Sequence, residues 1–554
     1  MSEVFLVYAT ALILGWPLGK YLSAIMTGKG SRFDSVFAVI ERPLLWVVGK
    51  SAQQQMDTAA YIRAFLVSNL TLGALVYGVF LFQGSLPLNP DGVGNLSWDL
   101  ALHTMVSFLT NTNQQHYSGQ AQLSYLSQTL AIVTLQFLTP IMGMALAVAT
   151  LRKLMGSNSA GNFWTDLVRP GVRFFLPLAL VLSLLLSWQG VPSTLAAGPV
   201  ASTLDSSVEM TKQKIPLGPV APMVAIKQLG TNGGGWYGPN SSVPLENPTP
   251  LSNFLQTLAL ILIPVSLVFM VGYFTGKPRF AALVFGVMLS LSVMSTGAAL
   301  WAEASFNSSH PEMAMEGKEQ RFTEESSVLW AVLTTQTSNG SVNNMHDSLA
   351  PLTGLVLMIN MLINAIWGGI GCGLSQFVVY LLLSVFLSGL MTGRSPELFG
   401  RKIESGEVRL LGILVLLQPV TLLAFTAFTF FNPGFSGVSN PGAHGLSQVF
   451  YEYLSAFANN GSGFEGLGDG TLWWNLSATL VLILGRYPAL IIPLLVASKL
   501  AEKRVSPAGE GTLRVDSVTF GLVLIAIILV LTLLQFLPVL MLGPVAEHLS
   551  LIQH

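Results

Sequence analysis

Four short clusters of Thr, Asn, Ser and Gly recur along the chain. They read Thr110-Asn111-Thr112-Asn113-Gln114-Gln115, Thr231-Asn232-Gly233-Gly234-Gly235-Trp236, Thr337-Ser338-Asn339-Gly340-Ser341-Val342 and Ala458-Asn459-Asn460-Gly461-Ser462-Gly463. They begin 121, 106 and 121 residues apart. A single cluster of this kind is typical of an ordinary turn. Four at nearly even spacing predict an internal repeat.

A short half-polar segment precedes each cluster, and a long apolar stretch follows it. The short segments, of about three turns each, are too short to cross a bilayer, which takes about 20 apolar residues. We therefore expect re-entrant helices at 98–109, 221–229, 325–336 and 446–457. Non-helical backbone at membrane depth survives only where it is buried in protein or lines a water-filled cavity. Four such loops around one axis would surround a pore.

The composition agrees with a chain that lies in a bilayer. Of its 554 residues, 51% are hydrophobic and 10% are charged, whereas soluble proteins carry about 25% charged residues. An ordinary soluble enzyme is thereby excluded. The net charge of −1 excludes nucleic-acid binding driven by bulk charge. The single cysteine, Cys372, excludes an internal disulfide and a multi-cysteine metal site.

Ten stretches are long and apolar enough to cross the membrane. They are 3–26, 59–83, 124–154, 172–190, 252–276, 279–301, 352–394, 408–431, 472–498 and 515–543. The stretch 352–394 is too long for one straight crossing and contains Gly368, Gly369, Gly371 and Gly373, so we expect a broken helix there. The predicted fold is an all-α polytopic membrane protein. It has four pseudo-symmetric repeats of membrane helix, pore helix, filter loop and membrane helix, with one extra helix at each end.

The expected divisions of the chain follow this pattern. They are an N-terminal helix and loop (1–58), repeats at 59–155, 165–277, 279–403 and 408–504, and a C-terminal helix (513–554). Of the 26 Lys and Arg residues, 20 fall on one side of the predicted membrane, five on the other and one within a span. The basic side is expected to face the cytoplasm, which places both termini outside. The first helix begins with Glu3 rather than positive charge, so we do not expect it to be a signal peptide.

The clusters contain the residue types of a filter for a dehydrated cation. Such an ion needs oxygen ligands in place of its water, and backbone carbonyls supply them. Glycine helps successive carbonyls to turn inward, and Gly233, Gly234, Gly340, Gly461 and Gly463 provide it. The first cluster has Asn instead of Gly, so we expect an asymmetric filter. The predicted filter residues are Asn111, Thr112, Asn113, Thr231, Asn232, Gly233, Ser338, Asn339, Gly340, Asn459, Asn460 and Gly461.

The whole chain resembles the KdpA family, the potassium-translocating subunits of bacterial potassium-importing ATPases. The resemblance rests on the clusters and on further motifs along the chain. These are Tyr117-Ser118-Gly119, Leu229-Gly230 before the second cluster, Glu246-Asn247-Pro248-Thr249, Met315-Glu316-Gly317-Lys318-Glu319, Asn344-Met345-His346-Asp347-Ser348, Gly393-Arg394-Ser395-Pro396-Glu397 and Leu542-Gly543-Pro544-Val545-Ala546-Glu547. The resemblance implies that potassium is the ion bound at the filter residues.

It also implies partners in a bacterial inner membrane: a P-type ATPase subunit (KdpB), a periplasm-exposed subunit (KdpC) and a very small helical subunit (KdpF). Potassium would enter the filter from outside and pass through a tunnel to the ATPase subunit. The chain itself has no P-loop, since Gly49-Lys50-Ser51 follows Leu44 where the motif needs glycine, and no Asp-Lys-Thr-Gly motif. It is therefore expected to be a non-catalytic subunit that needs no cofactor.

Two other functions remain open. A stand-alone potassium channel or symporter of the Trk/Ktr/HKT type shares the four-repeat pore. The triple glycine Gly233-Gly234-Gly235 and the matched C-terminal span argue against it. A secondary transporter with alternating access would need inverted repeats, whereas these four all begin on the same side.

Two features could block a path that runs straight through. Arg486 lies in the middle of a span, where a charge costs about 2.5–3.5 kcal/mol, so it should face the protein interior. It could repel potassium below the filter or pair with a polar neighbour. The glycines Gly368, Gly369 and Gly371 could form a loop across the path or allow close helix packing. A familiar member of the family has an acidic residue just before this loop, but this chain has Asn364, so no salt bridge to Arg486 is assumed.

Several other residues carry weaker expectations. Gln115 lies where the family has filter-side polar residues that affect affinity, although it could also cap a helix end. Cys372 is expected to be a small packing residue. His103, His116 and His346 lie in different repeats or loops, so we expect no shared metal site. The charged outer segment 303–325 is expected to be solvated or to contact the periplasmic partner.

Overall fold

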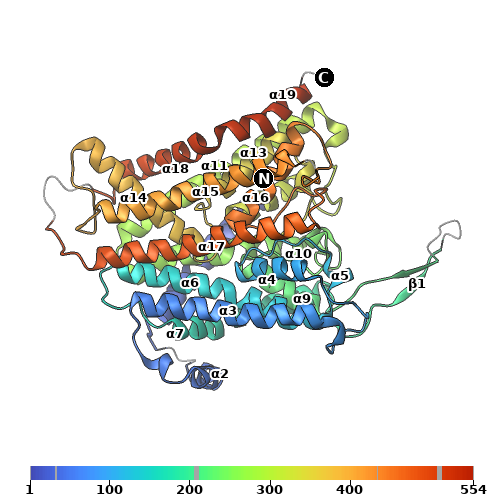
Figure 1. The fold of residues 1–554 in the computed structure, drawn as a ribbon, viewed down its shortest axis with the longest axis horizontal. Coiled ribbons are helices and arrows are strands. Elements are labelled where there is room, and N and C mark those ends of the chain that lie inside the picture. The colour runs from blue at the N-terminus through green and yellow to red at the C-terminus, as the bar shows by residue number, and fades with distance from the viewer. Residues whose placement is uncertain (1, 31–33, 205–210, 433, 508–513, 553–554) are drawn as a thin grey trace.

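The computed structural model describes residues 2–30, 34–204, 211–432, 434–507 and 514–552. Long helices lie side by side in one bundle (Figure 1). The N-terminal part has α1 (Ser2–Met26) and α2 (Asp34–Val48). Repeat 1 has α3 (Thr58–Phe82), α4 (Trp98–Leu109), α5 (Gly119–Gln122) and α6 (Thr134–Leu154), the last preceded by a π-helical segment, Ser127–Val133. Repeat 2 has α7 (Phe163–Pro170), α8 (Leu176–Trp188), α9 (Val220–Leu229) and α10 (Pro250–Thr275).

The remaining elements complete two further repeats and the C-terminal part. Repeat 3 has α11 (Pro278–Ser309), α12 (Glu324–Gln336), α13 (Pro351–Ile363) and α14 (Cys372–Thr392). Repeat 4 has α15 (Ser405–Phe431), α16 (Ala443–Ala458) and α17 (Leu472–Ala501). α18 (Val518–Leu540) and α19 (Ala546–Ile552) follow. Short helical turns lie at Gly49–Gln53, Gln83–Ser85, Gly171–Phe175, Asn240–Ser242, Pro311–Met313, His346–Ser348 and Met541–Val545.

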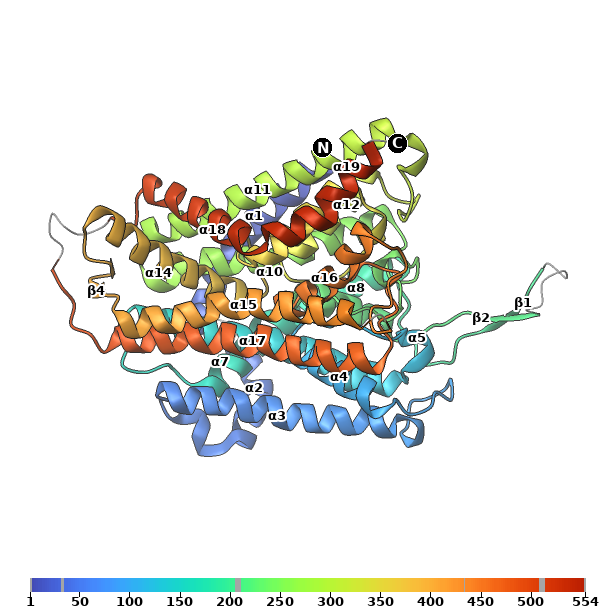
Figure 2. The ribbon, with the colours of Figure 1, turned by 45° about the horizontal axis from the view of Figure 1, so that its top comes forward.

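The strands are few and short. β1 (Val200–Ser202) pairs antiparallel with β2 (Lys212–Lys214), and β3 (Glu397–Leu398) with β4 (Arg401–Lys402). The β1–β2 hairpin projects from the end of the bundle where α4 and α9 lie (Figure 1). β4 lies at the opposite end (Figure 2). The predicted all-α fold is thus confirmed, with ten helical spans long and apolar enough to cross a membrane in the described residues.

The two membrane helices of each repeat differ in burial. We compare the buried share of the residues in the most apolar 18-residue stretch of each span. In the second helices this share is 78% for the span ending in α6, 83% for α10, 67% for α14 and 50% for α17. The first helices reach only 28–44%, and α1 and α18 only 22% and 28%. The second helices therefore form an inner layer around the clusters. The first helices and the two extra helices cover it and present apolar surface to lipid.

Four predicted spans differ from the structure by eight residues or more, and two of them, the sixth and the tenth, simply end later, at Ser309 and Leu551 rather than at 301 and 543. The fourth begins at Phe163 rather than 172, because Asn162 caps it by accepting a hydrogen bond from the Thr165 amide at 3.1 Å. The helix 352–394 does break, but the break begins at Asn364 rather than Gly368. Asn364 has a left-handed backbone (φ 47°) and ends α13, which asparagine tolerates better than most residues. α13 is therefore too short to span the membrane, and α14 makes the crossing.

Candidate functional site

The four clusters lie at the C-terminal ends of the short helices α4, α9, α12 and α16. The sequence placed these helices to within a few residues of their observed bounds. Eleven of the twelve predicted filter residues are buried, and Gly461 is partly exposed. Buried polar backbone that belongs to no helix or strand needs partners, either protein groups or an ion. The hydrogen bonds within and between the clusters therefore determine what the site can bind.

A shared backbone conformation makes the clusters equivalent. In each one, two residues separated by a third have positive φ. The first of each pair are Asn111, Thr231, Ser338 and Asn459 (φ 49° to 62°), and the second are Asn113, Gly233, Gly340 and Gly461 (φ 58° to 103°). Residues with a Cβ adopt this conformation at a cost of roughly 1–2 kcal/mol. Its recurrence at five non-glycine residues shows that the surrounding structure holds the backbone in place.

The residue between each pair makes the same hydrogen bond in every repeat. Its amide donates to the carbonyl five residues earlier, at 2.9–3.2 Å, in the pairs Thr112–Ser107, Asn232–Lys227, Asn339–Thr334 and Asn460–Ser455. This equivalence aligns Gly230, not Thr231, with Thr110, Thr337 and Ala458. The second cluster begins one residue earlier than the sequence spacing indicated, because the sequence comparison matched Thr with Thr. In the fold, Thr231 takes the position of Asn111.

The four clusters contact one another in a closed ring. A Cβ at Gly233 would collide with the Asn339 carbonyl of the third cluster, and one at Gly340 with the Asn460 carbonyl of the fourth. The ring closes where a Cβ at Gly461 would collide with the Thr112 carbonyl of the first cluster. The first and second clusters meet at Asn113 and Gly234. At Gly233, Gly340 and Gly461, glycine is therefore required both by the positive φ and by the approach of the neighbouring backbone.

Asparagine side chains reinforce the ring. Nδ2 of Asn232 donates to Oδ1 of Asn111 at 3.1 Å, which links the second cluster to the first. Equivalent donations run from Asn339 to the Lys227 carbonyl (3.0 Å) and from Asn460 to the Thr334 carbonyl (2.8 Å). Each of these side chains therefore ties its cluster to the preceding repeat.

The clusters differ in how their carbonyls are satisfied. In the second cluster, the carbonyls of Thr231, Asn232 and Gly233 accept hydrogen bonds from Asn111 Nδ2 (2.9 Å), the Gly234 amide (3.0 Å) and Asn240 Nδ2 (2.7 Å). Within the described ranges, no donor reaches the nine corresponding carbonyls of the other clusters. These belong to Asn111, Thr112, Asn113, Ser338, Asn339, Gly340, Asn459, Asn460 and Gly461. The ring thus offers oxygen atoms with free lone pairs, which suits a dehydrated cation.

Gln115 joins the first two repeats just beyond the ring. Its Nε2 donates to the Gly235 carbonyl at 3.1 Å, and its Oε1 accepts from the Gly235 amide at 2.9 Å. The Gln115 side chain therefore binds both the amide and the carbonyl of Gly235, near the end of the second cluster. This geometry differs from the helix-end cap considered from the sequence.

A buried ion pair that the sequence did not reveal supports the second cluster. Lys227 and Glu246 are fully buried and form a salt bridge, and Lys227 Nζ also donates to Asn240 Oδ1 at 2.6 Å. Oε1 of Glu246 accepts from the amides of Trp236 (2.7 Å) and Tyr237 (3.0 Å). The sequence did show a lysine, Lys227, inside a short apolar helix, which indicates a buried partner. It did not show that the partner is Glu246, which lies 19 residues away in a loop.

The segment 364–371, between α13 and α14, lies against the ring. The Gly368 amide donates to the Gln336 carbonyl at 2.7 Å, and the Ile370 amide to Thr231 Oγ1 at 3.1 Å. Asn364 accepts from Ser338 Oγ at 2.6 Å and donates to the Ala458 carbonyl at 3.1 Å. One loop therefore contacts the second, third and fourth repeats.

Arg486 lies close to the end of this loop. Its side chain is buried, with Nη1 donating to Cys372 Sγ at 2.8 Å and Nη2 to the Thr139 carbonyl at 3.3 Å. No carboxylate lies within ion-pair distance of it in the part of the chain that the structure describes. Its cation is thus held by neutral acceptors. Cys372, which was expected only to fill space, accepts a hydrogen bond from it.

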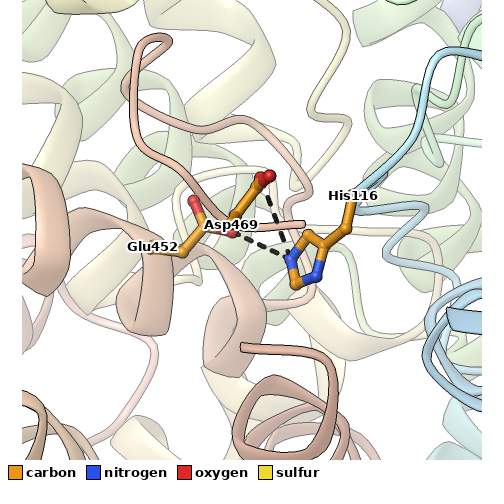
Figure 3. Close-up of side chains that lie close together, drawn as sticks. All are labelled: His116, Glu452 and Asp469. Carbon is orange, nitrogen blue, oxygen red and sulfur yellow. Dashed lines mark ion pairs between the residues drawn. The ribbon is translucent and has the colours of Figure 1, made fainter. Parts of the chain in front are cut away.

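The predicted separation of the histidines is only partly correct. The rings of His103 and His116 stack at 3.7 Å with an interplanar angle of 13°, so these two do come together. The two residues are 13 positions apart in the sequence. Their contact was missed because the sequence does not show that the chain turns back after α4. His346 lies elsewhere and pairs with Tyr451 Oη at 3.0 Å. His116 also faces two carboxylates, Glu452 and Asp469 (Figure 3).

Two further titratable groups, His444 and Glu465, form hydrogen bonds that connect loops near the ring. His444 lies 2.8 Å from Asp347 and 2.7 Å from Glu547. Burial opposes its charge, but these two hydrogen bonds outweigh burial and raise the pKa of His444 to about 10. Burial also raises the pKa of Glu465 to about 8, although its Oε2 accepts from the His346 amide at 2.8 Å. The charged segment 303–325 is partly internal, since Glu303 and Lys318 form a buried pair at 2.9 Å.

Comparisons with known proteins agree over nearly the full length. The family model described as KdpA, potassium-transporting ATPase A subunit, matches residues 5–549. The potassium-transporting ATPase potassium-binding subunit of Gloeobacter violaceus is 44% identical over 548 residues, which cover 96% of this chain and 95% of that protein. The protein of the same name from Pseudomonas putida is 44% identical over 545 residues, with 96% of each chain covered.

A solved structure shows the same fold at low sequence identity. The crystal structure of the potassium transporter TrkH from Vibrio parahaemolyticus matches with a TM-score of 0.52 and 14% identity, over 90% of this chain and 98% of that one. At this identity the likeness concerns the fold alone. The family match over residues 5–549 and the two relatives show that this chain belongs to the KdpA family of potassium-transporting ATPase A subunits.

Proposed function

We propose that this chain binds K⁺ in the ring of four clusters and translocates it from the periplasm, as the channel-like subunit of an ATP-driven importer. The observation that carries the proposal is the closed ring, in which four segments share one backbone conformation and present nine carbonyls that no donor reaches in the described ranges. K⁺ is a cation whose hydration shell such carbonyls can replace. The twelve predicted filter residues are proposed as its binding site, with the ion held by carbonyls of the first, third and fourth clusters and the second cluster closing the ring.

The proposal includes partners, because the sequence contains no P-loop and no Asp-Lys-Thr-Gly motif. A P-type ATPase subunit (KdpB) would supply the energy and receive the ion, with KdpC and KdpF completing the complex. We place the complex in the bacterial inner membrane with both termini of this chain outside. The strong bias of Lys and Arg to one side of the spans supports that orientation.

An importer must also prevent K⁺ from running straight through. The loop 364–371 contacts three of the four repeats, and the Arg486 cation lies at its end. We propose that Gly368, Gly369, Gly371 and Arg486 together close the direct path to the cytoplasm. The ion would then leave sideways, toward the ATPase subunit.

The test uses the complex purified through this chain after expression from its own operon. Gly233→Ala forces a Cβ onto the Asn339 carbonyl, and Gly233→Asp adds a charge at the same place. Gly297→Ala is the matched control, because a Cβ there meets nothing within 4 Å. Each sample is assayed for a copurifying ATPase and for ATP hydrolysis as K⁺ is titrated.

We expect an ATPase to copurify and K⁺ to stimulate it. Gly233→Ala should raise the half-stimulating K⁺ concentration by about tenfold or more, which corresponds to about 1.4 kcal/mol of lost binding, and Gly297→Ala should not change it. An unchanged K⁺ dependence in both Gly233 variants would contradict the filter assignment. If no ATPase copurifies and the chain alone conducts K⁺ in vesicles, the stand-alone channel takes the place of the pump subunit.

A further inference from the structure

A buried histidine faces two carboxylates beside the ring (Figure 3). Nε2 of His116 lies 3.4 Å from Oε1 of Glu452 and 4.0 Å from Oδ2 of Asp469. The three atoms lie within 4.8 Å of one another. His116 follows the first cluster, Glu452 is on α16, and Asp469 precedes α17, so three separate segments meet at one point.

The hydrogen bonds of His116 determine which of its nitrogens is free. Nδ1 lies 2.8 Å from Oδ1 of Asn475, whose Nδ2 donates to Asp99 Oδ2 at 2.8 Å. Because the Asn475 amide nitrogen is directed to Asp99, its oxygen faces the imidazole and accepts a hydrogen bond from Nδ1–H. In the neutral imidazole, Nε2 then carries the lone pair. It is buried, has no hydrogen-bond partner in the described ranges, and points at both carboxylates. Such an arrangement is repulsive unless a proton or a metal ion lies between the three groups.

We propose that His116, Glu452 and Asp469 form a binding site for one divalent transition-metal ion of the Zn²⁺ class. One imidazole nitrogen and two carboxylate oxygens are a donor set that such ions accept. Ligands of a tetrahedral Zn²⁺, at about 2.0–2.1 Å from the ion, lie about 3.4 Å apart. The His116–Glu452 distance already has this value, and the His116–Asp469 distance exceeds it by about 0.6 Å. The Asp469 side chain is 31% exposed, which gives the ion a path of entry and the carboxylate room to move.

The surrounding groups fit a metal site. Asn475 holds the imidazole in the tautomer that a metal needs, and Gln114 donates to the Glu452 carboxylate, as partners of metal ligands commonly do. His103 cannot bind the same ion in this arrangement. A metal lies in the plane of its imidazole ligand, whereas the His103 ring is stacked 3.7 Å away. An ion here would tie the loop after the first cluster to the fourth repeat.

The test measures metal binding on the intact complex and is independent of transport. Protein washed with a chelator is titrated with Zn²⁺ and counted for bound metal after gel filtration, and its X-ray absorption is recorded. The variants are His116→Asn and Asp469→Asn. The second changes a partly exposed residue and keeps the test valid if the first fails to fold. His444→Gln is the matched control, since both nitrogens of His444 already face carboxylates and neither is free for a metal.

We expect one Zn²⁺ per chain, with nitrogen and oxygen ligands, and an affinity that falls by at least about 100-fold in each variant but not in the control. Zn²⁺ that binds equally to wild type and to both variants is adventitious surface metal and would overturn the proposal. Absence of binding to the wild type would overturn it too, and would mean that a proton on Nε2 balances the two carboxylates.

Discussion

Asn113 occupies the position that glycine holds in the other three clusters. The missing glycine led us to expect an asymmetric filter, with asparagine tolerating the left-handed backbone in its place. The structure gives Asn113 the same left-handed conformation, with φ 58° against 73°, 87° and 103° for the glycines, because asparagine tolerates it. The asymmetry lies in the second cluster, whose carbonyls accept hydrogen bonds from Asn111, Gly234 and Asn240. The sequence could not show this, since those donors are found only once the chain is folded.

Arg486 offers a test of the proposed barrier. Arg486→Gln removes the charge and keeps a donor for the Thr139 carbonyl. A unit charge repels a cation that passes within several ångströms by about 3 kcal/mol at an effective dielectric constant of about 20. K⁺ flux into vesicles without ATP should therefore rise by about 100-fold. Arg486→Lys keeps the charge, so its K⁺ flux without ATP should stay at the wild-type level. If Arg486→Gln leaks no more than wild type, Arg486 only holds α17 to its neighbours.

His444 gives the stability of the complex a defined pH dependence. Its folded pKa of about 10 lies above the usual value of 6.5, so its contribution is full below pH 6.5 and disappears as the pH rises through about 10. Because the group is partly exposed, we expect about 2 kcal/mol rather than the full value of the shift. The difference in melting temperature between wild type and His444→Gln should shrink steadily from pH 6.5 to pH 10. A difference that does not change with pH would show that His444 acts by packing alone.

Among the helices, the sequence predicted lengths and order well and the ends less well. Apolar length located the ten spans and the four short helices before the clusters. The sixth and tenth spans end eight residues later than predicted, and two other missed ends depend on single asparagine residues. Asn162 caps α7 and extends its span, and Asn364 ends α13 before the glycines are reached. Hydropathy does not detect either effect, because both are made by one side chain or one backbone angle.

The packing of α1 on α10 depends on two glycines one helical turn apart. A Cβ at Gly15 would lie 2.8 Å from Val265, and one at Gly19 would lie 2.7 Å from Phe269. Small residues at this spacing let membrane helices approach closely. Gly19→Leu should therefore destabilise the complex by about 1–3 kcal/mol through overpacking. Thermal unfolding in detergent measures this. Gly78→Leu on α3 is the control, because its Cβ would meet nothing within 4 Å. Equal losses in the two variants would contradict close packing at Gly19.

Taken over the full bundle, four repeats place their second helices inside and their first helices outside. The repeat spacing predicted four such units around one axis. The contacts that join the repeats could not be predicted from the sequence, because they connect residues about 100 positions apart. Two of them are the bridge from Gln115 to Gly235 and the hydrogen bond from Asn364 to the Ala458 carbonyl. These contacts follow only from closing the four clusters into a ring.

The position of the bound ion decides whether the ring is the filter. Tl⁺ replaces K⁺ and scatters anomalously, so crystals of the complex grown with Tl⁺ would locate it. We predict a peak inside the ring, bounded by carbonyls of the first, third and fourth clusters, and its loss in Gly340→Ala, where a Cβ would collide with the Asn460 carbonyl. A complex that Tl⁺ still stimulates, but that shows no peak inside the ring, would contradict the proposed site.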